Sequence, residues 1–282
     1  MLEEPDRPGA VEGPGTARAR GAEPAAVAGL PGRPTRSAQP MRPVLERARF
    51  ADRRAAGQEL AQALQLLELP NPLVLALPRG GVPVAAEVAR RLKAPLELLL
   101  VRKIGAPGQP ELAVAAIAAL GGCAVEGGGA QPETVVDDRL MAATGADKAH
   151  VDRGVARERV ELERRQHCYL QGRTPISPGG RTVIVVDDGI ATGTTVRAAL
   201  KALKAWRGAP SAPSAPSAPL AEHRPLTTVL AVPVAPAQAL AELANEVDEV
   251  VCLWTPALFM AVGAHYRDFR QVSDEEVVAA LA

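Results

Sequence analysis

The chain has 282 residues, 47% of them hydrophobic, which is enough apolar material for one α/β domain with appendages or for two small domains. Its 32 basic and 32 acidic residues cancel, which disfavours a protein that binds nucleic acid through overall basic charge. No apolar run approaches the roughly 20 residues of a membrane-spanning helix, and the N-terminus lacks a signal peptide's apolar segment. We therefore expect a cytoplasmic protein without nucleic-acid or membrane partners.

Two segments have the composition of unstructured chain. Residues 1–40 are rich in Ala, Gly, Pro and Arg without apolar periodicity, and so predict a disordered tail. Residues 209–225 contain a tandem Ser-Ala-Pro repeat, which predicts a low-complexity insertion on the surface. The remaining chain, residues 41–282, is expected to form a single domain.

Within that domain, apolar strand patterns alternate with helical ones. Helices are predicted at residues 50–67, 82–92, 150–170, 195–206 and 235–244, with a short terminal helix capped by Ser273. Strands are predicted at residues 73–77, 96–101, 181–186, 226–232 and 249–253. Residues 105–135 carry many glycines and prolines and are predicted as a mobile loop with short strand pieces. This alternation predicts an α/β fold, with a mostly parallel sheet and helices on both faces.

The most informative segment is residues 183–195, Val-Ile-Val-Val-Asp-Asp-Gly-Ile-Ala-Thr-Gly-Thr-Thr. Four β-branched residues predict a buried strand, and Asp187 and Asp188 stand at its carboxyl end, where open α/β sheets bind ligands. The turn that follows leads into a helix N-terminus, whose free N–H groups and dipole favour a phosphate. The predicted phosphate-binding residues are Ala191, Thr192, Gly193, Thr194 and Thr195.

Two adjacent carboxylates repel phosphate, but they accept hydrogen bonds from vicinal hydroxyls of a ribose, directly or around Mg²⁺. Carboxylates beside a phosphate site therefore indicate a ribose 5-phosphate. A tight strand–helix connection with an Asp cap is the alternative. The sequence lacks the Gly and Lys pattern of a P-loop, and the turn lacks the glycine spacing of a dinucleotide fingerprint.

Two further groups of residues favour an anion. Arg79, Gly80 and Gly81 follow the first strand, where glycine backbone N–H groups can face an anion and the arginine adds charge. Arg102 and Lys103 end the neighbouring strand, where two cations would repel each other without an anion. An ordinary Gly-rich turn and a solvated strand end are the alternatives.

Residues 187–195, here called the acid-pair turn, resemble with their preceding strand the phosphoribosyl-pyrophosphate (PRPP) motif of type I phosphoribosyltransferases. The likeness covers roughly residues 50–282, apart from the Ser/Ala/Pro insertion, and is closest to a bacterial subgroup of that family. The other matching segments are residues 77–83, 101–107, 261–263, 266–269 and 272–276.

This resemblance implies a Mg²⁺-dependent glycosyltransferase of nucleotide salvage, which moves the 5-phosphoribosyl group of PRPP to a nitrogenous base and releases pyrophosphate. It implies catalytic roles for Asp187, Asp188 and Lys103, with Asp187 and Asp188 at the Mg²⁺, directly or indirectly. It further implies that the pyrophosphate contacts Arg79, Gly80, Gly81 and Arg102, in a loop with a cis peptide at Arg79–Gly80 or Gly80–Gly81. A mobile lid is expected from Glu111 and residues 121–129.

For the base, the resemblance implies a small hood formed by the C-terminal segment 254–282. Phe259 would stack on a nucleobase-like acceptor, and Asp268 would approach the Mg²⁺-pyrophosphate group. The aromatic residues there could instead form a small accessory core. Ala191 stands where 6-oxopurine enzymes carry an acidic general base, so hypoxanthine and guanine are disfavoured and the acceptor stays unnamed.

Two alternative functions remain open at this point. The chain could be a non-catalytic PRPP sensor, as in regulators that share the fold, or a carrier of another phosphorylated ligand. Dimers are common among similar enzymes, so a homodimer is compatible with the sequence, which does not fix the oligomeric state.

Overall fold

The computed structural model describes residues 48–120, 132–170, 173, 176–205 and 227–282. All of them belong to the unit Arg42–Ala282. The predicted tail at residues 1–40 and the predicted insertion at residues 209–225 lie outside the described residues, and both stay predictions. Within the described part of the chain, every helix is too short or too polar to cross a membrane.

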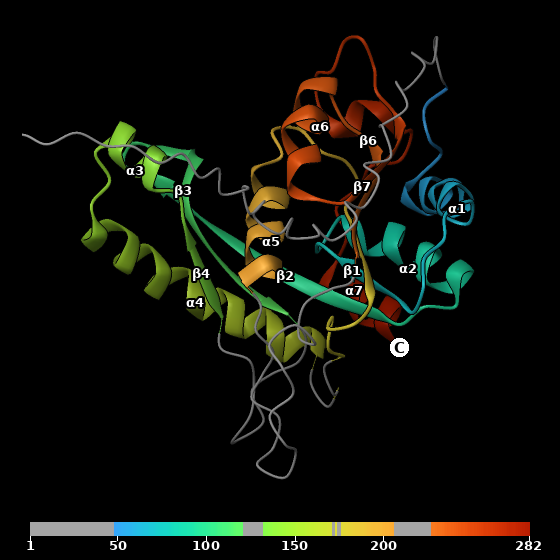
Figure 1. Ribbon diagram of the computed structural model, residues 1–282, viewed down its shortest axis with the longest axis horizontal. Coiled ribbons are helices and arrows are strands. Elements are labelled where there is room, and N and C mark those ends of the chain that lie inside the picture. Colours follow the sequence, from blue (N-terminus) through green and yellow to red (C-terminus); the bar gives the residue numbers. More distant parts are fainter. Residues whose placement is uncertain (1–47, 121–131, 171–172, 174–175, 206–226) are drawn as a thin grey trace, which may run out of the picture. The chain divides into compact units, whose positions relative to one another are not determined.

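Seven strands form one sheet in the order β4-β3-β2-β1-β5-β6-β7 (Figure 1). They are β1 (Pro72–Ala76), β2 (Leu96–Ala106), β3 (Gln109–Leu120), β4 (Glu133–Val136), β5 (Thr182–Val186), β6 (Thr227–Val234) and β7 (Glu249–Trp254). The run from β2 to β7 is parallel throughout, and β3 is antiparallel to both of its neighbours. The predicted mostly parallel sheet is confirmed.

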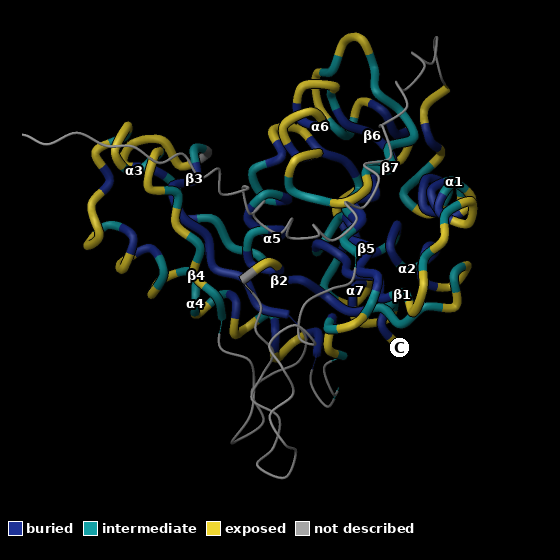
Figure 2. Tube along the Cα trace, viewed as in Figure 1, coloured by how far each residue is buried: buried dark blue, intermediate teal, exposed yellow. Residues whose placement is uncertain are grey.

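Helices cover both faces of this sheet, as predicted. One face packs against α1 (Arg53–Leu64), α2 (Gly81–Leu92), α4 (Lys148–Leu170) and α7 (Asp274–Leu281), and the other against α5 (Thr194–Ala205) and α6 (Ala237–Leu243). In β5, Val183 and Val185 face α5, while Ile184 and Val186 face the opposite layer. Because both faces are covered, the central strands β1 and β5 are almost entirely apolar, and Figure 2 shows them as buried.

The predicted mobile loop at residues 105–135 is wrong over its first half. Residues 109–120 form β3, which pairs with an extended β2 in a long hairpin beside α4 (Figure 1). The ladder shifts register at Gly105, where a Cβ would lie 2.5 Å from the Pro110 carbonyl oxygen, so the glycine and proline mark a bulge. Of the predicted lid, Glu111 lies in β3, and residues 121–129 lie outside the described residues. The helix α3 (Asp138–Thr144), which follows β4, was not predicted.

The two ends of the described chain meet beside the sheet. Phe50 forms a bridge with Tyr266, and the two rings join Trp254 and Phe269 in an aromatic cluster. Two short 3-10 turns, η2 (Ala244–Glu246) and η3 (Val262–His265), flank β7. The terminal helix α7 starts with a Ser273 capping box and packs into the main core. Residues of the predicted hood thus supply both an accessory core and part of the main one.

Candidate functional site

The acid-pair turn lies where β5 ends, at the carboxyl edge of the parallel strands. The Ile190 N–H donates to the Val234 carbonyl at 2.9 Å, which fixes the turn against β6. Gly193, with a φ of 74°, precedes the first turn of α5, and a Cβ there would lie 3.1 Å from a Leu243 methyl group. Ala191 and Thr192 are exposed, and the hydroxyls of Thr192 and Thr194 are 3.0 Å apart. The turn therefore presents hydroxyls and a helix N-terminus to solvent.

The turn after β1 packs directly on this acid pair. A Cβ on Gly80 would lie 2.2 Å from Asp188 Oδ2, and one on Gly81 would lie 2.7 Å from the Val186 carbonyl oxygen. Both positions therefore require glycine for the close approach of the two turns. A cis peptide bond is present in this loop, but at Pro78–Arg79, one bond before the first of the two predicted positions.

Both turns line one cavity of about 300 Å³. Its walls are Arg53, Leu77, Pro78, Arg79, Gly80, Asp187, Asp188, Thr195, Phe269, Gln271 and Val272. Five predicted site residues are therefore brought together there: Arg79, Gly80, Asp187, Asp188 and Thr195. Segments more than 100 residues apart in the sequence thus meet around one cavity.

Burial and mutual repulsion disfavour the ionised form of the acid pair. Burial raises the pKa of Asp187 well above its ordinary range, and repulsion from Asp188 raises it further. Burial also raises the pKa of Asp188, although the neighbouring Arg53 guanidinium opposes that rise. The Asp188 N–H donates to Asp187 Oδ1 at 2.9 Å. Hydroxyl donors or a cation in the cavity would stabilise the ionised carboxylates.

Two residues that contact this pair were not predicted from the sequence. Arg53, at the start of α1, donates from Nε to Asp188 Oδ2 at 2.8 Å. The Tyr266 hydroxyl donates to the Asp188 carbonyl oxygen at 2.5 Å. Neither residue lies in a glycine-rich or acidic motif; the one available signal is chemical, since two adjacent buried carboxylates need a nearby cation.

Other predicted site residues lie elsewhere. In β2, Leu98 is the partner of Ala76, the last residue of β1. Arg102 comes four residues later and therefore lies roughly 13 Å past the end of β1. Its guanidinium pairs with Glu158 of α4 at 2.6 Å. Neither Arg102 nor Lys103 is among the residues that line the cavity. Asp268 lies in a neighbouring cavity of about 130 Å³ and pairs with Arg270 at 2.9 Å.

The ring expected to stack on a base is also engaged elsewhere. Phe259 stacks on His265, with ring centroids 5.3 Å apart and planes 24° from parallel. The aromatic residue that lines the acid-pair cavity is Phe269. Phe259 therefore packs against the accessory core, and its stacking on a base stays a prediction, whereas Phe269 is the ring that lines the cavity beside the acid pair.

The acid pair fits one mode of Mg²⁺ binding. Among the described residues, no three His, Cys, Asp or Glu side chains form a cluster that could hold a metal ion. Asp187 and Asp188 offer two carboxylates, and Arg53 already pairs with one of them. Mg²⁺ commonly keeps waters and takes substrate phosphates with one or two carboxylates, so the donor set fits an ion carried by the substrate rather than a protein cage.

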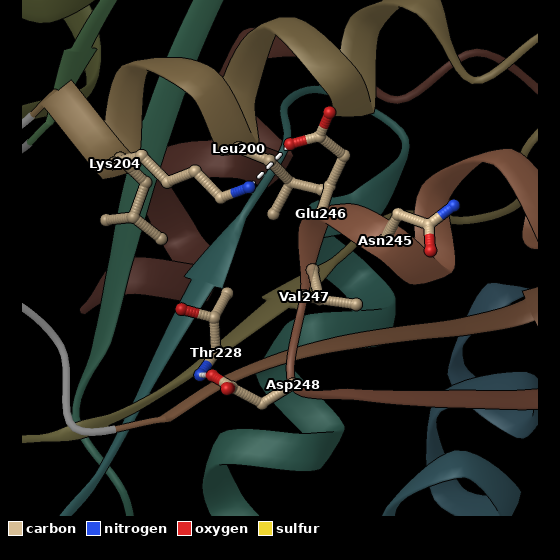
Figure 3. Close-up of a pocket in the computed structure, with 8 residues that line it drawn as sticks. Leu200, Lys204, Thr228, Asn245, Glu246, Val247 and Asp248 are labelled. Carbon is tan, nitrogen blue, oxygen red and sulfur yellow. Dashed lines mark hydrogen bonds and ion pairs between the residues drawn. The ribbon is translucent and has the colours of Figure 1, made fainter. Parts of the chain in front are cut away.

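A second cavity, of about 290 Å³, lies at the opposite edge of the sheet, where β6 begins and α5 ends (Figure 3). There Lys204 pairs with Glu246 at 2.5 Å, and Asp248 accepts from the Thr228 N–H at 2.7 Å. Each of these charged side chains thus already has a partner within the cavity wall. This cavity contains none of the predicted site residues.

Comparisons with known proteins agree with this geometry. The profile of the phosphoribosyl transferase domain family matches residues 50–215. Two curated Mycobacterium tuberculosis proteins, named "Putative phosphoribosyl transferase MT0597" (strain CDC 1551 / Oshkosh) and "Putative phosphoribosyl transferase Rv0571c" (strain H37Rv), are each 44% identical over 232 residues, 82% of this chain and 46% of theirs.

The chain thus spans about half the length of these curated relatives. The crystal structure of TT1426 from Thermus thermophilus is 42% identical, with a TM-score of 0.65 over 83% of this chain and 97% of that one. The family profile covers more than half of the sequence, including both turns at the cavity. The chain belongs to the phosphoribosyl transferase domain family.

Proposed function

We propose that the chain transfers a 5-phosphoribosyl group from PRPP to a nitrogenous base and releases pyrophosphate. The observation that carries the proposal is the cavity at the carboxyl edge, where the half-buried pair Asp187–Asp188 meets the N-terminus of α5. Acceptor carboxylates beside a site with N–H and hydroxyl donors match a phosphorylated sugar with free hydroxyls.

In this proposal, each part of PRPP meets a group of suitable chemistry. The 5-phosphate takes the N–H and hydroxyl donors of residues 191–195 at the start of α5. The ribose hydroxyls donate to Asp187 and Asp188. The pyrophosphate lies toward Arg79, whose guanidinium lines the cavity and is only weakly engaged by Asp274, at 3.4 Å.

The reaction then breaks the bond from the anomeric carbon to the pyrophosphate oxygen. A base nitrogen forms the new bond to that carbon and releases its proton to solvent. The leaving pyrophosphate takes the electron pair, and Arg79 stabilises its charge. Mg²⁺ bound together with the substrate would supply further positive charge to the leaving group. The acid pair holds the ribose and stabilises the positive charge that develops on it, so orientation and electrostatics carry most of the catalysis.

Lys103 and Arg102 enter this proposal in a secondary role. They lie on the β2–β3 hairpin, outside the cavity lining, so contact with pyrophosphate requires the hairpin or the ligand to approach. Variants Lys103→Met and Arg102→Met are expected to lower turnover less than an Arg79→Met variant. The reverse order would assign the pyrophosphate to the hairpin.

The test is a screen of purines, pyrimidines and their analogues with PRPP and Mg²⁺, read out as pyrophosphate release. Wild type is expected to release pyrophosphate with at least one acceptor, and Asp188→Asn to lose that signal. Because Ala191 replaces an acidic base, hypoxanthine and guanine are the least favoured acceptors. PRPP binding without release for any acceptor would instead support a non-catalytic PRPP sensor.

A further inference from the structure

Arg53, at the start of α1, contacts two other segments at the wall of the cavity: the acid-pair turn and the C-terminal segment with Phe269 and Arg270. Its Nε donates to Asp188 Oδ2 at 2.8 Å, and its Nη1 donates to the Arg270 carbonyl oxygen, also at 2.8 Å. Its guanidinium carbon lies 3.8 Å from the centre of the Phe269 ring. The Arg53 side chain is only 11% exposed, and its guanidinium is held through two of its nitrogens and on one face at once.

Asp188 is correspondingly restrained on several sides. Arg53 takes one carboxylate oxygen, Gly80 packs against the same oxygen, and Tyr266 bonds the backbone carbonyl. A carboxylate has two oxygens with about four acceptor sites, so a bond to Arg53 leaves capacity for a hydroxyl. The contacts therefore fix the direction of the carboxylate without saturating it.

The neighbouring negative charge explains why such a restraint is needed. Asp187 and Asp188 are adjacent at one strand end, so the two carboxylates repel each other. Without a fixed cation, Asp188 would reduce that repulsion by rotating away. The planar guanidinium of Arg53 is anchored at the Arg270 carbonyl, so it opposes such rotation better than the flexible ammonium of a lysine would.

We propose that Arg53 is a positioning residue for sugar recognition, which holds the Asp188 carboxylate in the direction that accepts a ribose hydroxyl. The proposal rests on the proposed function, and it assigns Arg53 to the hydroxyl side of the site alone. The phosphate side, at residues 191–195, follows the acid pair in the same turn, but the hydrogen bonds of Arg53 go to Asp188 and Arg270 and not to those residues. Loss of Arg53 therefore weakens recognition of hydroxyls and spares recognition of phosphate.

Calorimetric titrations with three probes test this separation: ribose 5-phosphate, 2-deoxyribose 5-phosphate and inorganic phosphate. Wild type is expected to bind ribose 5-phosphate about tenfold more tightly than the 2-deoxy sugar, the effect of one hydrogen bond to a charged acceptor. Arg53→Met is expected to lose that preference and to keep the wild-type affinity for inorganic phosphate.

Two further variants make the test specific. Arg54→Met removes the next arginine, which is exposed and pairs with Glu87, and it should keep the wild-type preference. Arg53→Lys keeps the charge but not the fork, and its preference should fall at least about threefold below that of wild type. If Arg53→Met does not fold, the Arg53→Lys variant tests the proposal in its place. A wild-type preference for ribose 5-phosphate over the 2-deoxy sugar in Arg53→Lys would then overturn the proposal.

The outcomes separate this inference from the proposed function. A folded Arg53→Met variant that still prefers ribose 5-phosphate overturns the role of Arg53 and leaves the proposed function standing. A wild-type protein without any preference between the two sugars overturns both. Equal loss of affinity for all three probes in Arg53→Met would assign Arg53 a general structural role and would also contradict the proposal.

Discussion

Gly80 and Asp188 are packed so closely that a Cβ on Gly80 would lie 2.2 Å from Oδ2 and 2.7 Å from Cγ of the carboxylate. The backbone of Gly80 is helical, with a φ of −59°, so the position demands glycine for space and not for conformation. The turn after β1 and the acid pair after β5 therefore depend on each other, although the two residues are more than 100 positions apart in the sequence.

This contact predicts the behaviour of a Gly80→Ala variant. The added methyl group must displace Asp188, because the carboxylate is already held by Arg53. Steady-state kinetics should show PRPP turnover reduced by roughly tenfold or more, the effect of a misaligned hydrogen bond to a charged group. Gly180→Ala is the matched control. Gly180 has a φ of 67° and open space around it, so alanine there strains the backbone without displacing a neighbour. This variant should lower the free energy of unfolding by about 1 kcal/mol and leave turnover intact. Equal turnover in the two variants would contradict this view of the turn.

Removing a charge from the acid pair should raise stability while it abolishes function. The pKa of Asp187 is raised above its ordinary value of 3.8 by burial and by Asp188, so its ionised form destabilises the fold at neutral pH. Stability contributed by the protonated form is lost as pH rises from that value through the higher folded pKa. Asp187→Asn stays neutral and can still accept from the Asp188 N–H.

Thermal unfolding at pH 7 should therefore show a higher Tm for Asp187→Asn than for wild type, by roughly 2–4 °C for each kcal/mol relieved. The gap should close as the pH falls below about 4, where the wild-type carboxyl is protonated in both states. A variant less stable than wild type at pH 7 would show that the carboxylate is better solvated in the protein than these contacts imply.

Glu97, which lies away from the cavity, allows a second test of how a buried carboxyl with a raised pKa affects stability. It is 1% exposed in β2, and burial raises the pKa of its carboxyl above the ordinary 4.5. The charge of Arg173 and backbone groups at Ile176 and Leu98 oppose that rise without cancelling it. Between pH 5 and pH 8, denaturant unfolding of wild type should show falling stability, and Glu97→Gln should flatten that slope without changing PRPP turnover. An identical pH dependence in both proteins would mean that Glu97 is neutralised by Arg173.

The two phenylalanines near the site should separate in their effects. Phe259 stacks on His265 within the accessory core, whereas Phe269 lines the cavity under Arg53. Phe269→Leu should raise the KM for PRPP severalfold, because Arg53 loses the ring on which it rests. Phe259→Leu should lower Tm by a few degrees, since it removes a ring contact, with a smaller effect on that KM. A larger KM effect at Phe259 would restore the base-stacking role that the family resemblance implied.

The parts of the fold that local chemistry determines could be predicted from the sequence. Four β-branched residues before Asp187 indicate a buried strand, and the Thr/Gly turn after them indicates a helix start; both are present. The strand β3 could not be predicted, because its alanine-rich run does not alternate and is buried only through packing against α4 and α5. Strand identity there is a tertiary effect.

The site divides in the same way. The acid pair and the Arg79 turn are local motifs, so their residue types indicated their chemistry. The pairing of Arg53 with Asp188 spans 135 positions and leaves no local pattern. Which ring reaches the cavity also depends on how the C-terminal segment packs, so the position of Phe269 beside the acid pair could not be predicted from the sequence.

The central claim is that the acid pair binds the hydroxyls of a sugar whose phosphate lies at the start of α5. Calorimetric titration of PRPP with Mg²⁺ into wild type and into the Asp187→Asn/Asp188→Asn double variant tests it most directly. Saturable binding by wild type, weakened at least tenfold in a folded double variant, is the predicted result. Equal affinity in the two proteins, or no heat of binding in wild type, would contradict it.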